Sequence, residues 1–395
     1  METTDAFDGL VCRDCGARHD PADAPGRCPD CGGLLRAVYG LDAVDPGAFE
    51  TAGARAGSMW RFAELLPIPA GTATSLGEGG TPLVECPRLA DELGVGRLLV
   101  KDEGGNPTGS VADRGLSVAI TAAAAAGATD VALPSAGNDG HAAAAYAGRA
   151  GLASHVFVPT RSGFVQKAMI NVHGGDMSVV EGRLPEATDA YEAAMADEAG
   201  WHAVAPFAEP YRLQGRKTVL YEVVATLGGA PDALVHPTGE GAGVLGAHEA
   251  AAELESLDVI DDLPRLYAAQ ASGCAPIADA VESGGPVEPV ERPDTICADV
   301  EVPDPVAGDW VVEALHETGG GAVATDDPDV LESAVTVAEH EGVSMTPSGA
   351  AAASGAWALA ERGAFEPDDT VVLVNTGAGA KAADVLRSHL MGQGV

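Results

Sequence analysis

Short apolar runs alternate with longer helical stretches along most of this chain. The alternation begins near residue 97 and continues almost to the end, with apolar runs at residues 97–100, 131–133, 155–158, 233–235, 266–270 and 370–374. Strands that alternate with helices form parallel sheets covered by helices on both faces. The pattern therefore predicts an α/β protein built on parallel sheets. The proline- and glycine-rich stretches 42–58 and 282–292 are predicted to be a linker and a surface loop.

One decapeptide, Asn-Pro-Thr-Gly-Ser-Val-Ala-Asp-Arg-Gly at residues 106–115, separates a predicted strand from a predicted helix. It follows the run 97–100 and precedes the alanine-rich run 116–126. The backbone N–H groups at a helix N-terminus, together with the helix dipole, favour an anionic ligand. We therefore expect a ligand site at this turn.

Three further turns, at residues 135–141, 237–244 and 375–381, also follow predicted strands and precede predicted helices. Open α/β sheets bind their ligands at such positions. The second turn is rich in small residues, which let backbone N–H groups close around a phosphate, although Glu240 adds a carboxylate. Each turn taken singly is a weak signal, because many glycine-rich turns are purely structural.

Four of the seven cysteines form two Cys-x-x-Cys pairs, Cys12 with Cys15 and Cys28 with Cys31. Two such turns can present four thiolates tetrahedrally to one Zn²⁺, and a closed four-thiolate site is structural rather than catalytic. Incidental cysteines are the alternative.

Composition limits the partners. The chain has 395 residues, enough for two domains, and a formal net charge of −37 with lysine only at Lys101, Lys167, Lys217 and Lys381. So acidic a surface repels nucleic acid and anionic membranes, and it suits a protein of a high-salt cytoplasm. The acidic N-terminus lacks the basic start of a signal peptide, and no apolar run is long enough to span a bilayer. We expect a cytoplasmic protein.

The decapeptide resembles the catalytic signature of threonine synthases, pyridoxal-phosphate (PLP) enzymes of fold type II, which reads Asn-Pro-Thr-Gly-Ser-Phe-Lys-Asp-Arg-Gly. Leu-Gly-Glu-Gly-Gly-Thr-Pro-Leu at residues 76–83 is similar to another family segment, and so are residues 210–218, 269–277 and 347–351. The resemblance implies a tryptophan synthase β-like architecture of two parallel-sheet α/β domains and a homodimer. It places a zinc-ribbon-like segment at 1–40, a large PLP-binding domain at 59–114 and 221–395, and a smaller domain at 115–220.

The same resemblance implies roles for individual residues. The family converts O-phosphohomoserine to threonine and phosphate, with PLP as the electron sink. By this likeness the ligand of the chain is a small amino acid. The residues implied to bind the cofactor are Asn138, Gly239, Glu240, Gly241, Ala242, Gly243 and Thr376. Those implied to bind substrate are Ser135, Gly137 and Arg212.

Two departures from the family concern the chemistry. Ala112 occupies the position of the lysine that forms a Schiff base with the cofactor, and the four lysines present match other family lysines. Residues 206–209 read Pro-Phe-Ala-Glu where the family has a phosphate-gripping Asn-Ser-Ile-Asn. An engineered lysine-to-alanine change would explain Ala112 alone, whereas natural divergence explains both departures.

Three hypotheses follow: a threonine-synthase-like lyase with reduced or lost activity, a non-catalytic paralogue that binds cofactor, amino acid or an active partner subunit, and another fold type II activity. A threonine dehydratase or a cysteate synthase would need the lysine equally.

Overall fold

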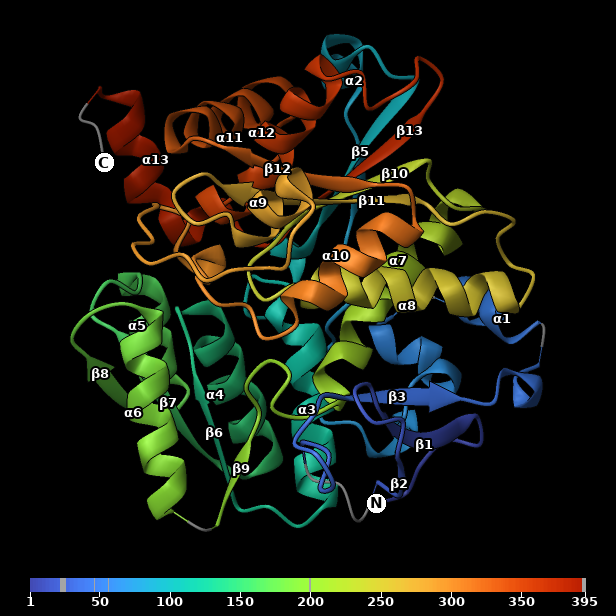
Figure 1. Cartoon of the computed structure of the whole chain (residues 1–395), viewed down its shortest axis with the longest axis vertical. Helices are drawn as coiled ribbons and strands as arrows, with labels where there is room; N and C mark the ends of the chain where they lie inside the picture. Colours follow the sequence, from blue (N-terminus) through green and yellow to red (C-terminus); the bar gives the residue numbers. More distant parts are fainter. Residues whose placement is uncertain (22–25, 46, 56, 199, 393–395) are drawn as a thin grey trace. The chain divides into compact units, whose positions relative to one another are not determined.

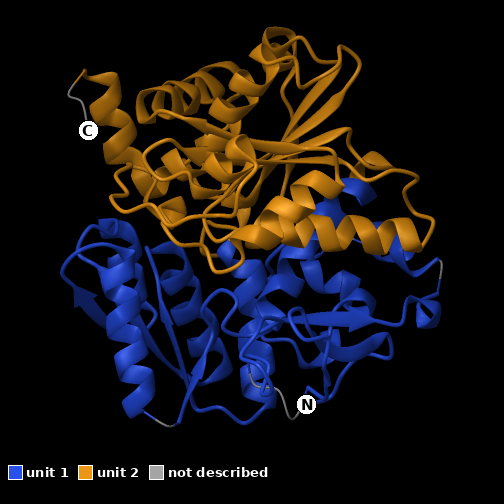
Figure 2. Cartoon of the chain, viewed as in Figure 1, with its two compact units in different colours: residues 1–80, 112–225 blue, residues 81–111, 226–395 orange. Residues whose placement is uncertain are grey.

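The computed structural model describes residues 1–21, 26–45, 47–55, 57–198 and 200–392. The chain forms two compact units, which Figure 2 colours separately. Unit 1 comprises residues 1–80 and 112–225, and unit 2 comprises residues 81–111 and 226–395. The chain passes from unit 2 back to unit 1 inside the decapeptide, between Val111 and Ala112. The three-part division predicted from the sequence stays a prediction; in the structure residues 1–80 group with 112–225.

Unit 2 is built on a six-stranded sheet in the order β12-β11-β10-β13-β5-β4 (Figure 1). Five of its strands are parallel, and only β4 (Leu83–Glu85) is antiparallel to its neighbour. The parallel strands are β5 (Arg97–Asp102), β10 (Ala233–Pro237), β11 (Arg265–Ala271), β12 (Gly321–Thr325) and β13 (Thr370–Asn375). Leu234 in β10 lies opposite Leu266 of β11 and Val372 of β13. Such continuous apolar strands are typical of sheets covered on both faces.

Helices cover both faces of this sheet. One layer contains α2 (Pro87–Leu93), α11 (Asp327–Glu341) and α12 (Pro347–Glu361), and the other contains α8 (Ala242–Ser256), α9 (Pro276–Ser283) and α10 (Gly308–Glu317). The last helix is α13 (Ala383–Leu390). Small residues let α12 approach the strands closely, since a Cβ on Gly355 would lie 2.9 Å from Ala269 and from Val323.

Unit 1 contains a four-stranded parallel sheet in the order β8-β7-β6-β9. Its strands are β6 (Asp130–Pro134), β7 (Ala153–Pro159), β8 (Asp176–Val180) and β9 (Trp201–Ala203), and its helices are α3 (Ala112–Ala125), α4 (Asn138–Ala150), α5 (Phe164–Val172), α6 (Leu184–Asp197) and α7 (Tyr211–Leu227). Val131 and Leu133 pack with Tyr146 of α4 on one face, whereas Ala132 packs with Tyr191 of α6 on the other. Alternate residues of β6 therefore pack in two different apolar clusters, one on each face of the sheet.

The N-terminal part of unit 1 forms a small antiparallel sheet of β1 (Phe7–Cys12), β2 (Arg18–His19) and β3 (Leu35–Tyr39). Phe7 and Leu10 pack with Tyr211 of α7 and Val118 of α3 in one apolar cluster. This segment is therefore part of the core of unit 1. The 3₁₀ turns of the chain are Leu41–Ala43, Met59–Leu65, Ala70–Thr72, Glu103–Gly105, Ala298–Val300 and Gly379–Ala382.

The predicted parallel sheets are confirmed, and each of the six apolar runs lies in a strand. Two predictions were wrong in detail. The linker at 42–58 contains α1 (Ala48–Gly53), and the loop predicted at 282–292 begins inside α9. Among the described residues, no helix is long and apolar enough to cross a membrane.

Candidate functional site

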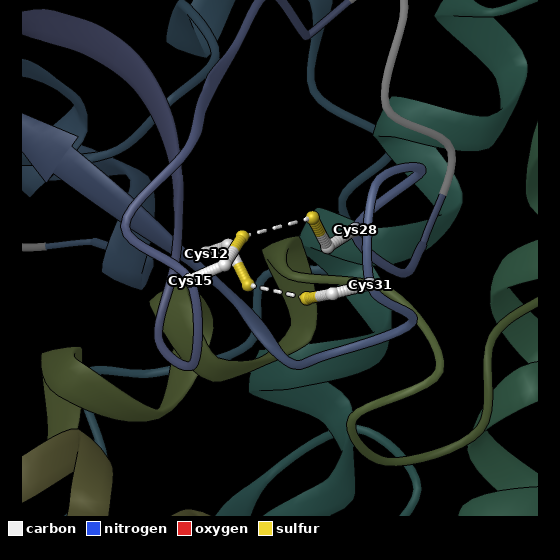
Figure 3. Close-up of side chains that lie close together, drawn as sticks. All are labelled: Cys12, Cys15, Cys28 and Cys31. Carbon is white, nitrogen blue, oxygen red and sulfur yellow. Dashed lines mark hydrogen bonds between the residues drawn. The ribbon is translucent and has the colours of Figure 1, made fainter.

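The four paired cysteines come together at the end of the N-terminal sheet, with their side chains turned towards one another (Figure 3). The sulfur atoms of Cys12 and Cys31 are 3.5 Å apart, and those of Cys15 and Cys28 are 3.7 Å apart. Backbone hydrogen bonds from Gly16 to Cys12 and from Gly32 to Cys28 form the two turns. Four thiolates at these separations match the tetrahedral coordination of Zn²⁺, so this cluster could hold a structural zinc ion.

Ala112, at the position implied for the catalytic lysine, is the first residue of α3. Its side chain is 2% exposed and belongs to the apolar cluster that includes Leu116 and Val131. A methyl group cannot form a covalent bond to a cofactor or carry a proton. The decapeptide therefore brings no nucleophile to the start of this helix at residue 112.

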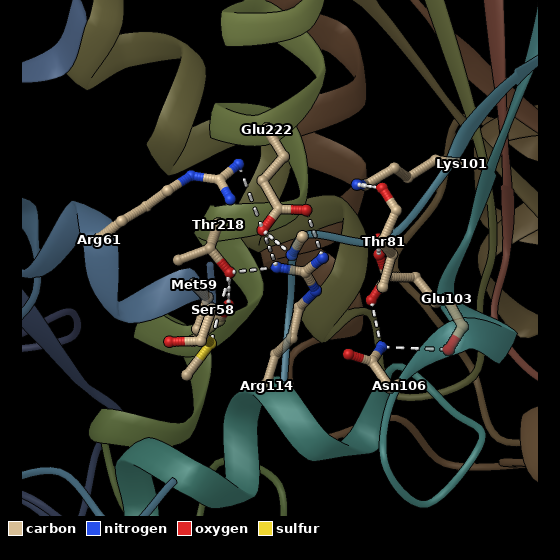
Figure 4. Close-up of polar contacts among 12 residues, drawn as sticks. Ser58, Met59, Arg61, Thr81, Lys101, Glu103, Asn106, Arg114, Thr218 and Glu222 are labelled. Carbon is tan, nitrogen blue, oxygen red and sulfur yellow. Dashed lines mark hydrogen bonds and ion pairs between the residues drawn. The ribbon is translucent and has the colours of Figure 1, made fainter. Parts of the chain in front are cut away.

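A buried ion pair holds the same turn of α3 in place (Figure 4). Arg114 donates through Nη2 to Oε2 of Glu222 at 2.7 Å and through Nη1 to Oε1 at 3.1 Å, and Nη1 also donates to Thr218 at 2.9 Å. Glu222 additionally accepts a hydrogen bond from the backbone of Gly80 at 2.7 Å. Both charged side chains are almost wholly buried. The sequence analysis missed this pair, because no local motif links residues so far apart in the chain.

Glu78 is the centre of a second buried network in unit 1. Its carboxylate accepts hydrogen bonds from Trp60 Nε1 at 2.7 Å, from Ser117 Oγ at 2.5 Å and from the hydroxyl of Tyr146 at 3.0 Å. Burial, together with the nearby negative charges, raises the pKa of Tyr146, so this hydroxyl stays a hydrogen-bond donor. The glutamate of the segment 76–83 thus joins three distant parts of unit 1.

The turn at residues 135–141 is closed by its own serine. Ser135 Oγ accepts hydrogen bonds from the backbone of Gly137 at 2.9 Å and of Gly140 at 2.8 Å. Gly137 has φ 147°, which favours glycine, and Asn138 begins α4. Asp139, the next residue, lies 2.5 Å from Nη2 of Arg212. The structure thus brings this predicted turn next to Arg212, another predicted substrate residue.

The N-terminus of α7 carries Glu209 and Arg212. The carboxylate of Glu209 accepts hydrogen bonds from the backbone N–H groups of Tyr211 and Arg212, both at 2.8 Å. Burial raises the pKa of Glu209 to about 7, despite these hydrogen bonds and the nearby charge of Arg212. Arg212 also donates to the carbonyl of Val204 at 2.9 Å. Glu209 therefore caps the N-terminus of α7 with its own carboxylate.

In unit 2 the glycines of the turn between β10 and α8 are closely packed and leave no space for a side chain. A Cβ on Gly243 would lie 2.0 Å from the ring of His236, and one on Gly241 would lie 2.2 Å from Val311. Gly241 caps α8 with φ 89° and provides no side-chain hydrogen bond to the helix. The N-terminus of this fifteen-residue helix has no side-chain cap, and its backbone N–H groups could receive the phosphate group of PLP. Gly239 and Ala242 belong to the same turn, and the Glu240 carboxylate opposes the charge of a phosphate there.

The turn after β13 lies against the first half of the decapeptide. Thr376 accepts a hydrogen bond through its carbonyl from Val111 N at 3.0 Å, and Ala378 N donates to the carbonyl of Gly109 at 3.0 Å. Since β10 and β13 are neighbouring parallel strands, the turn at 237–244 and the turn at 375–381 leave the same edge of the sheet. Two predicted cofactor turns and residues 106–111 therefore share one edge of unit 2.

All four lysines use their amino groups within the protein. Each Nζ atom donates a hydrogen bond to a backbone carbonyl: Lys101 to Thr81 at 2.8 Å, Lys167 to Thr160 at 2.8 Å, Lys217 to Leu65 at 3.1 Å, and Lys381 to Thr108 at 2.9 Å. Figure 4 shows the contact of Lys101 with Thr81. Lys101 and Lys217 are fully buried. These amines have structural roles where they lie.

Comparison with known proteins first defines the class of enzyme to which the chain is related. The family described as "Pyridoxal-phosphate dependent enzyme" matches residues 74–377. The threonine synthase of Methanosarcina acetivorans is 33% identical over 371 residues, covering 93% of this chain and 91% of that protein. That of Methanocaldococcus jannaschii is 32% identical over 378 residues, covering 94% and 93%. The chain therefore belongs to the threonine synthase family of pyridoxal-phosphate dependent enzymes.

Solved structures agree on the fold. A fungal L-serine ammonia-lyase from Rhizomucor miehei superposes with a TM-score of 0.68 at 20% identity, covering 79% of this chain and 98% of that one. Maize serine racemase gives a TM-score of 0.67 at 18% identity, covering 79% and 93%. The predicted fold type II architecture, with its N-terminal four-cysteine segment, is confirmed.

Proposed function

We propose that this chain binds pyridoxal phosphate and a small amino acid at the site of a threonine synthase, and that turnover of O-phosphohomoserine to threonine and phosphate is reduced or lost. The observation that carries this proposal is Ala112 at the start of α3, together with four lysines whose amines are bound to backbone carbonyls. When bound, the cofactor supplies an electron sink for chemistry at the amino acid. The protein would have to supply the proton carrier, and residue 112 supplies a methyl group.

Several residues would hold the cofactor. The backbone of Gly239, Gly241, Ala242 and Gly243 would receive its phosphate at the N-terminus of α8, and Thr376 would face its ring from the next strand. The family resemblance also assigns Asn138 to the cofactor, and Ser135, Gly137 and Arg212 to the amino acid. Binding would be non-covalent and weakened by Glu240, since a carboxylate near a phosphate lowers affinity.

Three further features belong to the proposal. The four cysteines hold a structural zinc ion, for which their sulfur separations are suitable. The family resemblance supports a homodimer. The net charge of −37 suits a high-salt environment, where salt screens the repulsion between acidic groups.

The test is a turnover assay on the full chain loaded with PLP. Threonine and inorganic phosphate are measured from O-phosphohomoserine, and cofactor binding is measured separately by equilibrium dialysis. We expect cofactor binding with little or no product, and a gain of product in Ala112→Lys. Turnover by the native chain at a rate typical of an enzyme, on the order of 1–10³ s⁻¹, would show that the lyase is active. Absence of cofactor binding would contradict the binding role.

A further inference from the structure

The N-terminus of α7 already contains a carboxyl group of the protein itself. Helix N-termini attract negative charge because their first backbone N–H groups lack partners within the helix. In this seventeen-residue helix the two oxygens of Glu209 receive the N–H groups of Tyr211 and Arg212, at 2.8 Å each. The Glu209 side chain lies in the protein interior, 4% exposed. A phosphate on a ligand would have to displace this carboxylate to use the same donors.

The positive charge of Arg212 is likewise used inside unit 1. Its guanidinium donates to the carbonyl of Val204 at 2.9 Å and pairs with Asp139 at 2.5 Å. Arg216, one helical turn further on, lies 3.9 Å from the same carboxylate oxygen of Asp139. The guanidinium of Arg212 is therefore engaged by the carbonyl of Val204 and the carboxylate of Asp139, which oppose its use by a phosphate.

The loop that carries Glu209 is held tightly. Phe207 adopts φ 55°, a left-handed conformation that costs energy for an aromatic residue. Ala208 N donates to the carbonyl of Ala205 at 3.1 Å, and its own carbonyl lies against Gly26, where a Cβ would approach it to 2.3 Å. These contacts restrain the backbone immediately before Glu209.

We propose that the amino-acid ligand of this chain carries a small uncharged side chain, such as a hydroxyl, rather than a phosphate ester, and that Glu209 and Asp139 set this preference. The inference rests on the proposed function, because it concerns the ligand of the same site. It does not depend on turnover. It assigns a specificity role to Glu209 through the two backbone N–H groups that it occupies, and to Asp139 through the guanidinium of Arg212.

Calorimetry on the full PLP-loaded chain tests the inference, above the pH at which Glu209 ionises. The ligands are homoserine and O-phosphohomoserine, which differ only in the phosphate. We expect homoserine to bind at least about tenfold more tightly, a difference of about 1.4 kcal/mol. Glu209→Gln, which removes the charge and keeps the shape, should reduce or reverse this ratio, as should Asp139→Asn. Asp8→Asn, at an exposed ion pair with Arg18, is the matched control and should leave the ratio unchanged.

A second readout does not require an amino-acid ligand. Inorganic phosphate should raise the melting temperature of Glu209→Gln more than that of the native chain. Circular dichroism shows whether Glu209→Gln and Asp139→Asn are folded. Tighter binding of O-phosphohomoserine than of homoserine by the native chain would overturn the inference while leaving the proposed function intact. If the native chain binds cofactor and neither amino acid, the proposed function fails, and the phosphate comparison still decides whether Glu209 blocks an anion.

Discussion

Arg114 and Glu222 form a buried ion pair two residues after Ala112, with Nη2 and Oε2 2.7 Å apart. The pair joins the first turn of α3 to α7, and through Gly80 it also fixes the end of the segment 76–83. The first turn of α3, which begins at Ala112, is thus fixed in the interior of unit 1.

Breaking this pair should destabilise the protein strongly. Glu222→Gln leaves the Arg114 guanidinium buried without a counter-charge, and we expect the free energy of unfolding to fall by about 3–5 kcal/mol. Denaturant titration followed by circular dichroism measures the change. The control is Asp8→Asn, whose exposed pair with Arg18 at 2.9 Å should contribute less than about 1 kcal/mol. Equal losses in the two variants would contradict the structural role of Glu222.

Metal removal should affect folding. We expect one zinc ion per chain in the native protein, bound by Cys12, Cys15, Cys28 and Cys31. Cys31→Ser should abolish zinc binding and lower the melting temperature, because metal binding and folding are coupled. Elemental analysis and thermal unfolding report the two effects. Cys86→Ser, at a buried cysteine outside the cluster, should keep its zinc; zinc retained in Cys31→Ser would refute the four-thiolate site.

Glu209 should give stability a specific pH dependence. Burial raises its pKa from 4.5 to about 7 in the folded chain. Between these values the folded state therefore binds more protons than the unfolded state, so the contribution of this group is fully present below pH 4.5 and is lost as the pH rises through about 7. Over this range Glu209→Gln should lose less stability than the native chain, by about 3 kcal/mol. Parallel pH profiles of the two proteins would show no role for Glu209.

Salt should stabilise the chain. The formal net charge of −37 produces self-repulsion in the compact state, and salt screens it. We expect the melting temperature to rise from low to molar concentrations of potassium chloride. A melting temperature that is independent of salt would remove the support for a high-salt protein.

The sequence predicted what depends on local pattern. Six strands of the two parallel sheets, β5, β6, β7, β10, β11 and β13, follow from short apolar runs, and the cysteine cluster follows from the spacing of Cys12, Cys15, Cys28 and Cys31. The glycine-rich turn before α8 also follows from residue size, because only glycine avoids His236 and Val311 at two of its positions.

Long-range polar contacts could not be predicted in this way. Glu222 is far from Arg114 in the sequence, and Glu78 joins residues as distant as Trp60 and Tyr146. The local sequence around a buried charged residue does not determine which distant residue it will pair with. The orientation of Glu209 is the most instructive case. Its carboxylate caps the N-terminus of α7, a contact that the residue type at position 209 does not specify by itself.

The central claim is that no lysine of this chain forms a covalent bond to pyridoxal phosphate. Borohydride reduction of the PLP-loaded native chain, followed by denaturation and peptide mapping, measures this directly. We predict that none of the four lysines is labelled, whereas Ala112→Lys is labelled at position 112. Stoichiometric labelling of Lys101, Lys167, Lys217 or Lys381 in the native chain would contradict the account.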